Sequence, residues 1–200
     1  IARRNKGNHI IISAIEHHAI LNSVEWLEKH GFRVTKLPVD STGLVHPEDL
    51  EKAIDDQTTL VSVMYVNNEV GTIQPIKELA KIAHAHGALF HSDCVQAMPY
   101  IRIDVADLGL DLMSMSGHKF YGPKGVGALY IRNGVKIDKL ICGGGQERAQ
   151  RGGTSNTPAI VGMARALEAA VRDMDENNAH MAALRDHFVE RVEKEIPYVR

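Results

Sequence analysis

Cysteine is scarce in this sequence: Cys94 and Cys142 are the only two, and they lie far apart with no CxxC pattern. A disulfide framework is therefore not expected, and free thiols are typical of a reducing compartment. Long apolar runs are also missing, since the longest, residues 9–15 and 60–66, are too short to cross a bilayer. The start of the chain lacks the order of a signal peptide. We expect a cytoplasmic protein that makes no contact with membranes.

An excess of charge of one sign is absent as well. The 25 acidic and 23 basic residues are intermixed and give a net charge of −2, so no field attracts nucleic acid. The expected partners are small molecules or proteins. With 200 residues, 44% of them hydrophobic, the chain can build one sizeable core, or a large domain with part of a second. It begins at Ile1 in a strand-like run and ends where another extended segment would start, so we expect a piece of a longer polypeptide.

What the sequence does contain is an alternation of short β-rich runs with helical patterns. Proline suits the first turn of a helix and glycine its end, and Pro47, Pro75, Gly31 and Gly87 stand at such positions. This alternation predicts an α/β fold with a mostly parallel sheet flanked by helices. The predicted strands cover residues 9–15, 32–39, 59–66, 87–93, 110–117 and 125–132, and the predicted helices cover residues 17–31, 46–55 and 75–87.

The pattern changes at Thr157. Residues 157–195 could be helical for most of their length, with Thr157 as the cap and Pro158 in the first turn. We therefore divide the chain into a large domain at 1–156 and, at 157–200, a long linking helix with the start of a truncated second domain.

Polar side chains follow four of the predicted strands at the point where each strand ends. Taken singly, each has an ordinary explanation as a helix cap, a turn residue or a solvated side chain. Ligands of open α/β sheets bind outside the carboxyl ends of the strands, however, and a histidine, an amide, a carboxylate and an amine at one edge resemble a catalytic set. The residues are Glu16, His17 and His18; Asn67, Asn68 and Glu69; Asp93 and Gln96; and Ser116, His118 and Lys119.

Several other motifs carry little. GHKFYGPKG lacks the GK[ST] order of a Walker A loop, and GGGQER lacks the GxGxxG spacing of a dinucleotide site. His84 and His86 stand two apart on a predicted helix and point to different faces. His91 with Asp93 is a weak metal signal, so no metal site is predicted.

The amine, the carboxylate and the imidazole together suggest one cofactor. A lysine at a sheet edge can form a Schiff base with a carbonyl, and pyridoxal phosphate needs an acidic partner for its pyridinium nitrogen. Lys119 and Asp93 supply these groups, and His17 can cover the exposed ring face. Ser116, Gly117 and His118, next to Lys119, could begin a phosphate cradle.

Five blocks of sequence make the suggestion specific. In order along the chain they resemble the signature blocks of the cysteine desulfurases, which are fold type I pyridoxal phosphate enzymes of the class V aminotransferase group. The resemblance runs from about His9 to the long helix after Thr157, and it implies the large domain of that fold. The blocks are EHHAIL, VNNEVGTIQPI, HSDCVQ, SGHKFYGPKGVGALYIR and GGGQERAQRGGT.

The resemblance implies a role for each matched residue. Lys119 is implied as the Schiff-base lysine that also shuttles the α-proton, and His17 as the histidine that stacks on the ring and moves protons. Family members lend the equivalent of Thr154 to the neighbouring subunit, which implies a homodimer with shared active sites. The implied cofactor contacts are Asp93 at the pyridinium nitrogen, Asn68 and Gln96 near the phenolic oxygen, and Ser116, Gly117, His118 and Thr154 at the phosphate.

The implied reaction converts L-cysteine to L-alanine and passes sulfur, through an enzyme persulfide, to an acceptor or scaffold protein of iron-sulfur cluster assembly or another sulfur pathway. We expect the nucleophilic loop cysteine and the arginine that binds the substrate carboxylate to lie outside this segment. Cys94 is expected to pack beneath the cofactor, and Cys142 to be a core or loop thiol.

Two alternatives stay open. One is another enzyme of the same fold, such as a selenocysteine lyase, an aminotransferase or a kynureninase relative. VNNEVG and RGGT favour the desulfurase. The other is a non-catalytic dimerisation or scaffold protein that has kept the fold, and the intact Lys119 argues against it.

Overall fold

One six-stranded sheet organises the chain, described over residues 6–199 in a computed structural model. Its strand order is β2-β1-β3-β4-β5-β6. Neighbouring strands are parallel except β5 and β6, which are antiparallel. The mostly parallel sheet predicted from the alternating pattern is confirmed. The strands are β1 (His9–Ser13), β2 (Arg33–Leu37), β3 (Thr58–Ser62), β4 (Leu89–Asp93), β5 (Leu112–Ser116) and β6 (Gly127–Ile131).

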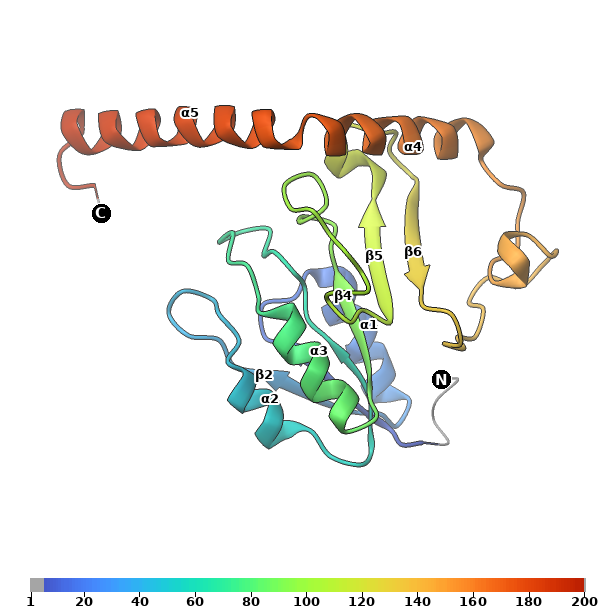
Figure 1. Cartoon of the computed structure of the whole chain (residues 1–200). Coiled ribbons are helices and arrows are strands. Elements are labelled where there is room, and N and C mark those ends of the chain that lie inside the picture. The colour runs from blue at the N-terminus through green and yellow to red at the C-terminus, as the bar shows by residue number, and fades with distance from the viewer. Residues whose placement is uncertain (1–5, 200) are drawn as a thin grey trace.

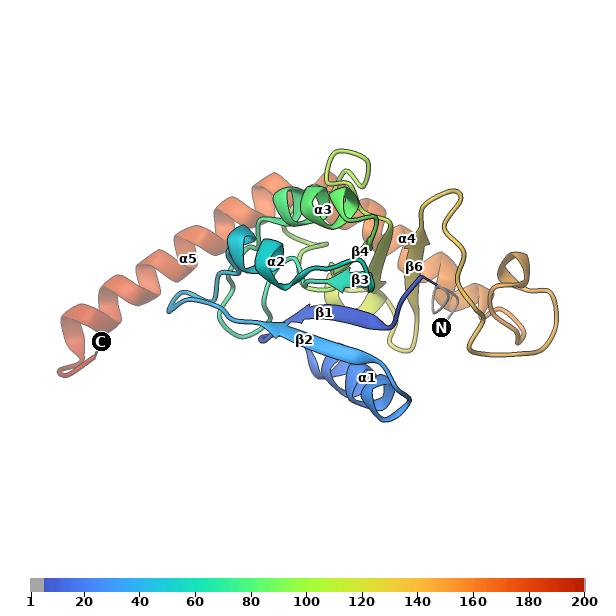
Figure 2. The same cartoon turned by 90° about the horizontal axis from the view of Figure 1, so that it is seen from below.

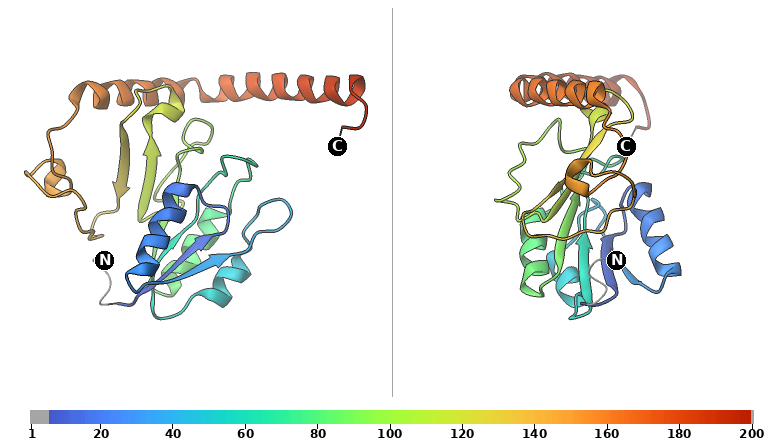
Figure 3. Two further views of the ribbon diagram at one scale, coloured as in Figure 1. Left: turned by 180° about the vertical axis from the view of Figure 1, so that it is seen from behind. Right: turned by 90° about the vertical axis from the view of Figure 1, so that its right-hand side faces the viewer.

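Helices cover the two faces of the sheet. Figure 2 shows α1 on one face and α2 with α3 on the other. The last two helices follow one another almost in a line across the end of the sheet, and α5 extends well beyond it (Figures 1 and 3). The helices are α1 (His18–Lys29), α2 (Pro47–Ala53), α3 (Ile76–Ala85), α4 (Thr157–Arg172) and α5 (Met174–Glu195), with short 3-10 turns η1 (Gly117–Phe120) and η2 (Glu147–Ala149).

Strand β1 lies at the centre of the packing and is buried over its whole length. Ile11 packs with Leu79 of α3 in the core on one face, and Ile12 packs with Val24 of α1 in a smaller cluster on the other. Burying an aliphatic side chain of this size stabilises a fold by about 1.5–3 kcal/mol. Because both faces are covered, β1 reads as a continuous apolar run instead of an alternating one.

The chain changes direction within the sheet beside β1. From β1 it runs through α1 to β2 on one side, and it then crosses to β3 on the other side of β1. In open α/β sheets such a switch opens a crevice at the carboxyl ends of the strands, where ligands bind. The topology therefore singles out the ends of β1 and β3 as the place for a site.

Most element boundaries fall within a few residues of those predicted. Helix α2 begins at Pro47, and Gly31 and Gly87 follow α1 and α3 with φ of +86° and +67°, a left-handed conformation that glycine adopts without strain. The predicted helix over 157–195 is two helices that part at Asp173. Its start coincides with the predicted domain boundary, although the division into domains stays a prediction. Within residues 6–199, no helix combines the length and the apolar character that a membrane span requires.

Candidate active site

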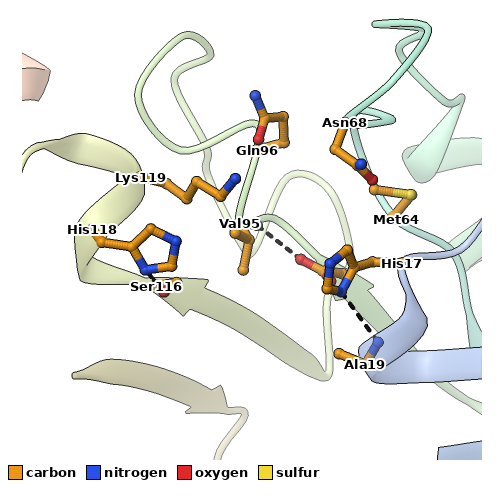
Figure 4. Close-up of a pocket in the computed structure, with 10 residues that line it drawn as sticks. His17, Ala19, Met64, Asn68, Val95, Gln96, Ser116, His118 and Lys119 are labelled. Atoms are coloured by element: carbon orange, nitrogen blue, oxygen red, sulfur yellow. Dashed lines mark hydrogen bonds between the residues drawn. The ribbon is translucent and has the colours of Figure 1, made fainter. Parts of the chain in front are cut away.

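A cavity of about 320 Å³ opens at the carboxyl ends of β1, β3, β4 and β5. Figure 4 shows the side chains converging on it from these separate segments. Seven of the nine residues proposed from the sequence line it, together with three that were not proposed, Ala19, Met64 and Val95. Its lining therefore brings together most of the predicted set, which comprises His17, Asn68, Asp93, Gln96, Ser116, His118 and Lys119.

Asp93 is the buried carboxylate of this cavity. It is the last residue of β4, and its Oδ1 accepts a hydrogen bond from the Val95 N–H at 2.9 Å. Burial raises the pKa of Asp93, while the Val95 N–H and the positive charges of His17 and Lys119 oppose that rise. A cationic N–H bound at this carboxyl would favour its charged form further.

His17 has two structural duties at once. It is the N-cap of α1, where its Nδ1 accepts a hydrogen bond from the Ala19 N–H at 3.1 Å, and it also lines the cavity. Because Nδ1 is the acceptor, the neutral ring carries its proton on Nε2. The ordinary explanation of a histidine after a strand, a helix cap, is thus correct and does not compete with a role in the site.

Lys119 enters the cavity from the turn η1 that follows β5. Figure 4 shows its amine extending between Gln96 and Val95, across the cavity from His17. The residue is exposed, and no hydrogen bond or ion pair of its amine occurs within residues 6–199. The backbone of this turn is tight, since a Cβ at Gly122 would lie 2.9 Å from the Gly117 carbonyl oxygen.

Two neighbouring asparagines have different roles. Asn67 is buried and builds the turn after β3, because its Oδ1 accepts from the Glu69 and Val70 N–H groups and its Nδ2 donates to the Ile15 carbonyl at 2.8 Å. Asn68, which Asn67 holds in place, is exposed and faces the cavity.

The phosphate contacts proposed from the sequence are only partly together. Ser116 and His118 line the cavity and hydrogen bond to each other, with 2.9 Å between Oγ and Nδ1. Gly117 lies between them and is buried. Thr154 is exposed in the long segment before α4 and does not line the cavity.

The two cysteines differ sharply in their surroundings. Cys94 is fully buried next to Asp93, and burial raises the pKa of its thiol to about 12. Such a thiol is a poor nucleophile, which agrees with the packing role expected for Cys94. Cys142 lies exposed in the loop after β6.

The prediction based on residues at strand ends did not include the apolar residues that line the cavity. Met64 is buried below the cavity, and Ala19 and Val95 flank His17 and Asp93. The prediction considered polar side chains only, so these apolar residues were not selected. Each lies within two residues of a strand end or of a proposed site residue, which is where a search for wall residues would have begun.

The cavity fits pyridoxal phosphate in size and in chemistry. Its volume lies at the lower end of the range of ligand pockets, about 300–1,000 Å³. The Oε1 atom of Gln96 is buried without a hydrogen-bond partner among residues 6–199, and an unsatisfied buried polar atom at a cavity is suited to a ligand. An amine, a carboxylate and an imidazole face the same space. In the described part of the chain, no three His, Cys, Asp or Glu side chains group in a way that could hold a metal ion.

Comparison with known proteins agrees with the fold. One family model, described as aminotransferase class V, matches residues 2–200. The chain belongs to this family. The resemblance to cysteine desulfurases carried by the five sequence blocks is likewise confirmed by the names of its relatives.

Three relatives of this class V aminotransferase chain are informative. Cysteine desulfurase IscS of Clostridium botulinum (strain Hall) is 55% identical over 199 residues, which are 100% of this chain and 50% of that protein. A solved NifS-like protein has a TM-score of 0.93 at 46% identity, over 96% of this chain and 53% of its own. SspA, solved in complex with cysteine, has a TM-score of 0.80 at 46% identity, over 84% of this chain and 49% of its own. The chain spans about half the length of the curated relatives it matches.

Proposed function

We propose that this chain forms the cofactor-binding part of a pyridoxal phosphate-dependent cysteine desulfurase. The observation that carries the proposal is the convergence of the Lys119 amine, the Asp93 carboxylate and the His17 imidazole on one cavity. Relatives named cysteine desulfurase and a structural neighbour solved with cysteine support the choice of substrate.

Each residue has a distinct task in this proposal. When bound, pyridoxal phosphate supplies an electron sink for negative charge that develops on the substrate. Lys119 would hold the cofactor through its aldehyde, and its Nζ would take up and return a proton during the reaction. Asp93 would hold the ring nitrogen in its protonated form, and His17 would lie against the ring with its Nε2–H as a proton donor. The remaining contacts would come from Asn68 and Gln96 at the phenolic oxygen and from Ser116, Gly117 and His118 at the phosphate.

The sulfur transfer needs a thiolate from elsewhere in the protein. The carbon–sulfur bond of L-cysteine breaks and leaves its electron pair on the carbon skeleton, which takes up a proton to become L-alanine. The sulfur forms a bond to an enzyme cysteine thiolate and passes from there to an acceptor or scaffold protein. Cys94 is too deeply buried for this attack, and Cys142 does not line the cavity. Following the family resemblance, we assign the nucleophile to a cysteine outside this segment.

We further propose a homodimer in the cytoplasm. Thr154 lies outside the cavity of its own chain and is exposed, as a residue lent to a neighbouring subunit must be. Two free cysteines are in keeping with a reducing compartment. Iron-sulfur cluster assembly is the proposed destination of the sulfur.

The test compares the full protein with its Lys119→Ala variant after addition of pyridoxal phosphate. We expect a visible absorbance band of the lysine-bound cofactor in the wild type and none in the variant, because the variant lacks the amine. Alanine and sulfide are then measured with L-cysteine as substrate. A band that does not depend on Lys119 would overturn the cofactor assignment. A lysine-dependent band with turnover of selenocysteine or another amino acid, and none of cysteine, would favour the alternative enzymes of the same fold.

A further inference from the structure

Glu16 is a buried carboxyl group beside the cavity that the proposed chemistry does not use. It follows β1 and directly precedes His17, and 5% of its surface is exposed. It does not line the cavity. Carboxyl groups are rarely buried to this extent unless they are paired or fully hydrogen bonded, so its position calls for an explanation.

Two hydrogen bonds to Glu16 converge on a single oxygen. The Ser13 hydroxyl donates to Oε1 at 2.5 Å, and the Met64 N–H donates to the same atom at 2.8 Å. Oε2 is buried and has no hydrogen-bond partner within residues 6–199. This asymmetry suits a neutral carboxyl group, in which one oxygen accepts as a carbonyl and the other carries the proton. An ionised group would leave charge on a buried, unpartnered oxygen, which costs more than a neutral O–H at that place.

The surroundings of Glu16 also disfavour a negative charge. From β3 it meets the Met64 amide, from its own turn the Ser13 hydroxyl, and from the end of β4 the like charge of Asp93. Within the described residues, no cationic side chain acts on it. Burial above all, with a smaller contribution from Asp93, raises the pKa of Glu16 to about 7, although the Ser13 hydroxyl, the Met64 N–H and the Ser13 backbone oppose this.

We propose that Glu16 in its protonated form is a neutral clamp: a positioning residue that ties the carboxyl ends of β1 and β3 together behind His17 without placing a second negative charge beside Asp93. Its contacts join Ser13, the last residue of β1, to Met64 in the cavity wall. The inference rests on the proposed function, because it assigns to Asp93 the charge at the ring nitrogen. Ionisation of Glu16 would raise the pKa of Asp93 by repulsion and weaken that role.

The first test needs no cofactor. Side-chain carboxyl carbons of glutamate are followed by ¹³C NMR during a pH titration of the full protein, and the signal that disappears in Glu16→Gln identifies Glu16. We expect its midpoint near pH 7, far above the ordinary value of about 4.3. In Ser13→Ala the midpoint should rise further, since that hydroxyl favours the charged form. A midpoint between pH 4 and 5 in the wild type would overturn the proposal.

The second test compares wild type, Glu16→Gln and Glu16→Ala by the affinity for added pyridoxal phosphate. Glutamine keeps an acceptor oxygen and stays neutral, so at pH 6 it should bind the cofactor as the wild type does. As the pH rises to 8, the affinity of the wild type should fall about threefold or more relative to Glu16→Gln. Alanine accepts neither hydrogen bond and cannot hold the turn. Glu16→Ala should therefore bind pyridoxal phosphate about tenfold more weakly than the wild type at both pH values. If the ratio of the wild-type affinity to the Glu16→Gln affinity stays constant from pH 6 to pH 8, the neutral clamp is contradicted.

The two tests separate the clamp from the proposed function. If neither the wild type nor the variants bind pyridoxal phosphate, the proposed function fails. The NMR titration still decides whether Glu16 is neutral. If the cofactor binds and Glu16 titrates normally, the clamp fails and the proposed function stands.

Discussion

The two ends of the sheet hold buried polar groups in opposite ways. At the amino end, Asp111 is fully buried: its Oδ2 accepts from the Phe90 N–H at 2.7 Å and lies 2.8 Å from His84 Nε2, and its Oδ1, which makes no hydrogen bond among the described residues, forms an ion pair with Arg132 at 2.5 Å. At the carboxyl end, Asp93 accepts one backbone hydrogen bond. Buried polar groups are normally satisfied, so the carboxyl end, where Asp93 has fewer partners than Asp111, is the end arranged for a ligand.

The same contrast holds for the neighbours of these aspartates. His9, at the amino end of β1, lies between the hydroxyls of Thr35 and Thr58, each at 2.8 Å. At the carboxyl end, Glu16 and Gln96 each keep a buried oxygen without a partner in the described part of the chain. At the amino end Asp111 Oδ1 also lacks a hydrogen bond, but the charge of Arg132 pairs with it. A site that binds ligand gives up some stability for that purpose, and here the cost is greater at the carboxyl edge.

The comparison is tested most strongly by Asp93→Asn. In the proposed enzyme we expect the rate of cysteine turnover to fall by a factor of about a thousand, because the ring nitrogen would lose the acidic partner that we propose for it. The free energy of unfolding should change by less than about 1 kcal/mol, since burial already disfavours the charged form of Asp93. Turnover by a coupled alanine assay and urea unfolding check the two parts. Asp107→Asn, at an exposed aspartate, is the matched control and should change neither.

Asp111→Ala should have the reverse signature. It leaves the buried Phe90 N–H without an acceptor and releases His84 and Arg132, so we expect a loss of about 3 kcal/mol in unfolding free energy. Cofactor affinity should hold in the fraction that stays folded, because Asp111 lies at the opposite end of the sheet from the cavity. Urea unfolding and cofactor titration measure the two effects. A loss below about 1 kcal/mol would remove the distinction between the ends.

Sequence patterns predicted the polar residues at the carboxyl end of the sheet far better than those at the amino end. Asp93 and Lys119 stand at or just after strand ends, so hydrophobic periodicity locates them. Asp111, His84 and Arg132 come from three distant segments, and each alone resembles a surface residue. Nothing local in the sequence shows that they meet.

The same limit applies to two finer features. The Glu16 contact with the Met64 amide joins residues 48 positions apart, and only the pairing of β1 with β3 brings them together. The break at Asp173 escaped prediction because the residues on both sides favour a helix.

The pH dependence of the free energy of unfolding extends the comparison to two more buried groups, His91 and Glu16. His91 lies buried between the hydroxyls of Ser62 and Ser114, and burial lowers its pKa to about 4. The unfolded chain takes up a proton near pH 6.5 and the folded chain does not, so this contribution to stability is lost as the pH falls from about 6.5 to 4. The loss approaches about 3 kcal/mol.

Glu16 acts with the opposite sign. Its raised pKa gives a contribution that is complete below about pH 4.5 and is lost as the pH rises to about 7. Urea unfolding between pH 4.5 and 7.5 should therefore show a flatter acid limb in His91→Gln and a flatter neutral limb in Glu16→Gln. Parallel curves for wild type and His91→Gln would contradict the assignment of a neutral buried His91.

The smallest effect is expected from Arg33→Ala at the amino end. Arg33 pairs with Asp55, but the two side chains are 48% and 41% exposed, and such pairs contribute less than about 1 kcal/mol. The readout is instead His9, whose pKa burial lowers first and the Arg33 charge lowers further. Removal of that charge should move the NMR titration of His9 to higher pH, while leaving its contacts with the two threonines intact. An unchanged His9 titration would mean that the charge of Arg33 does not act on the imidazole.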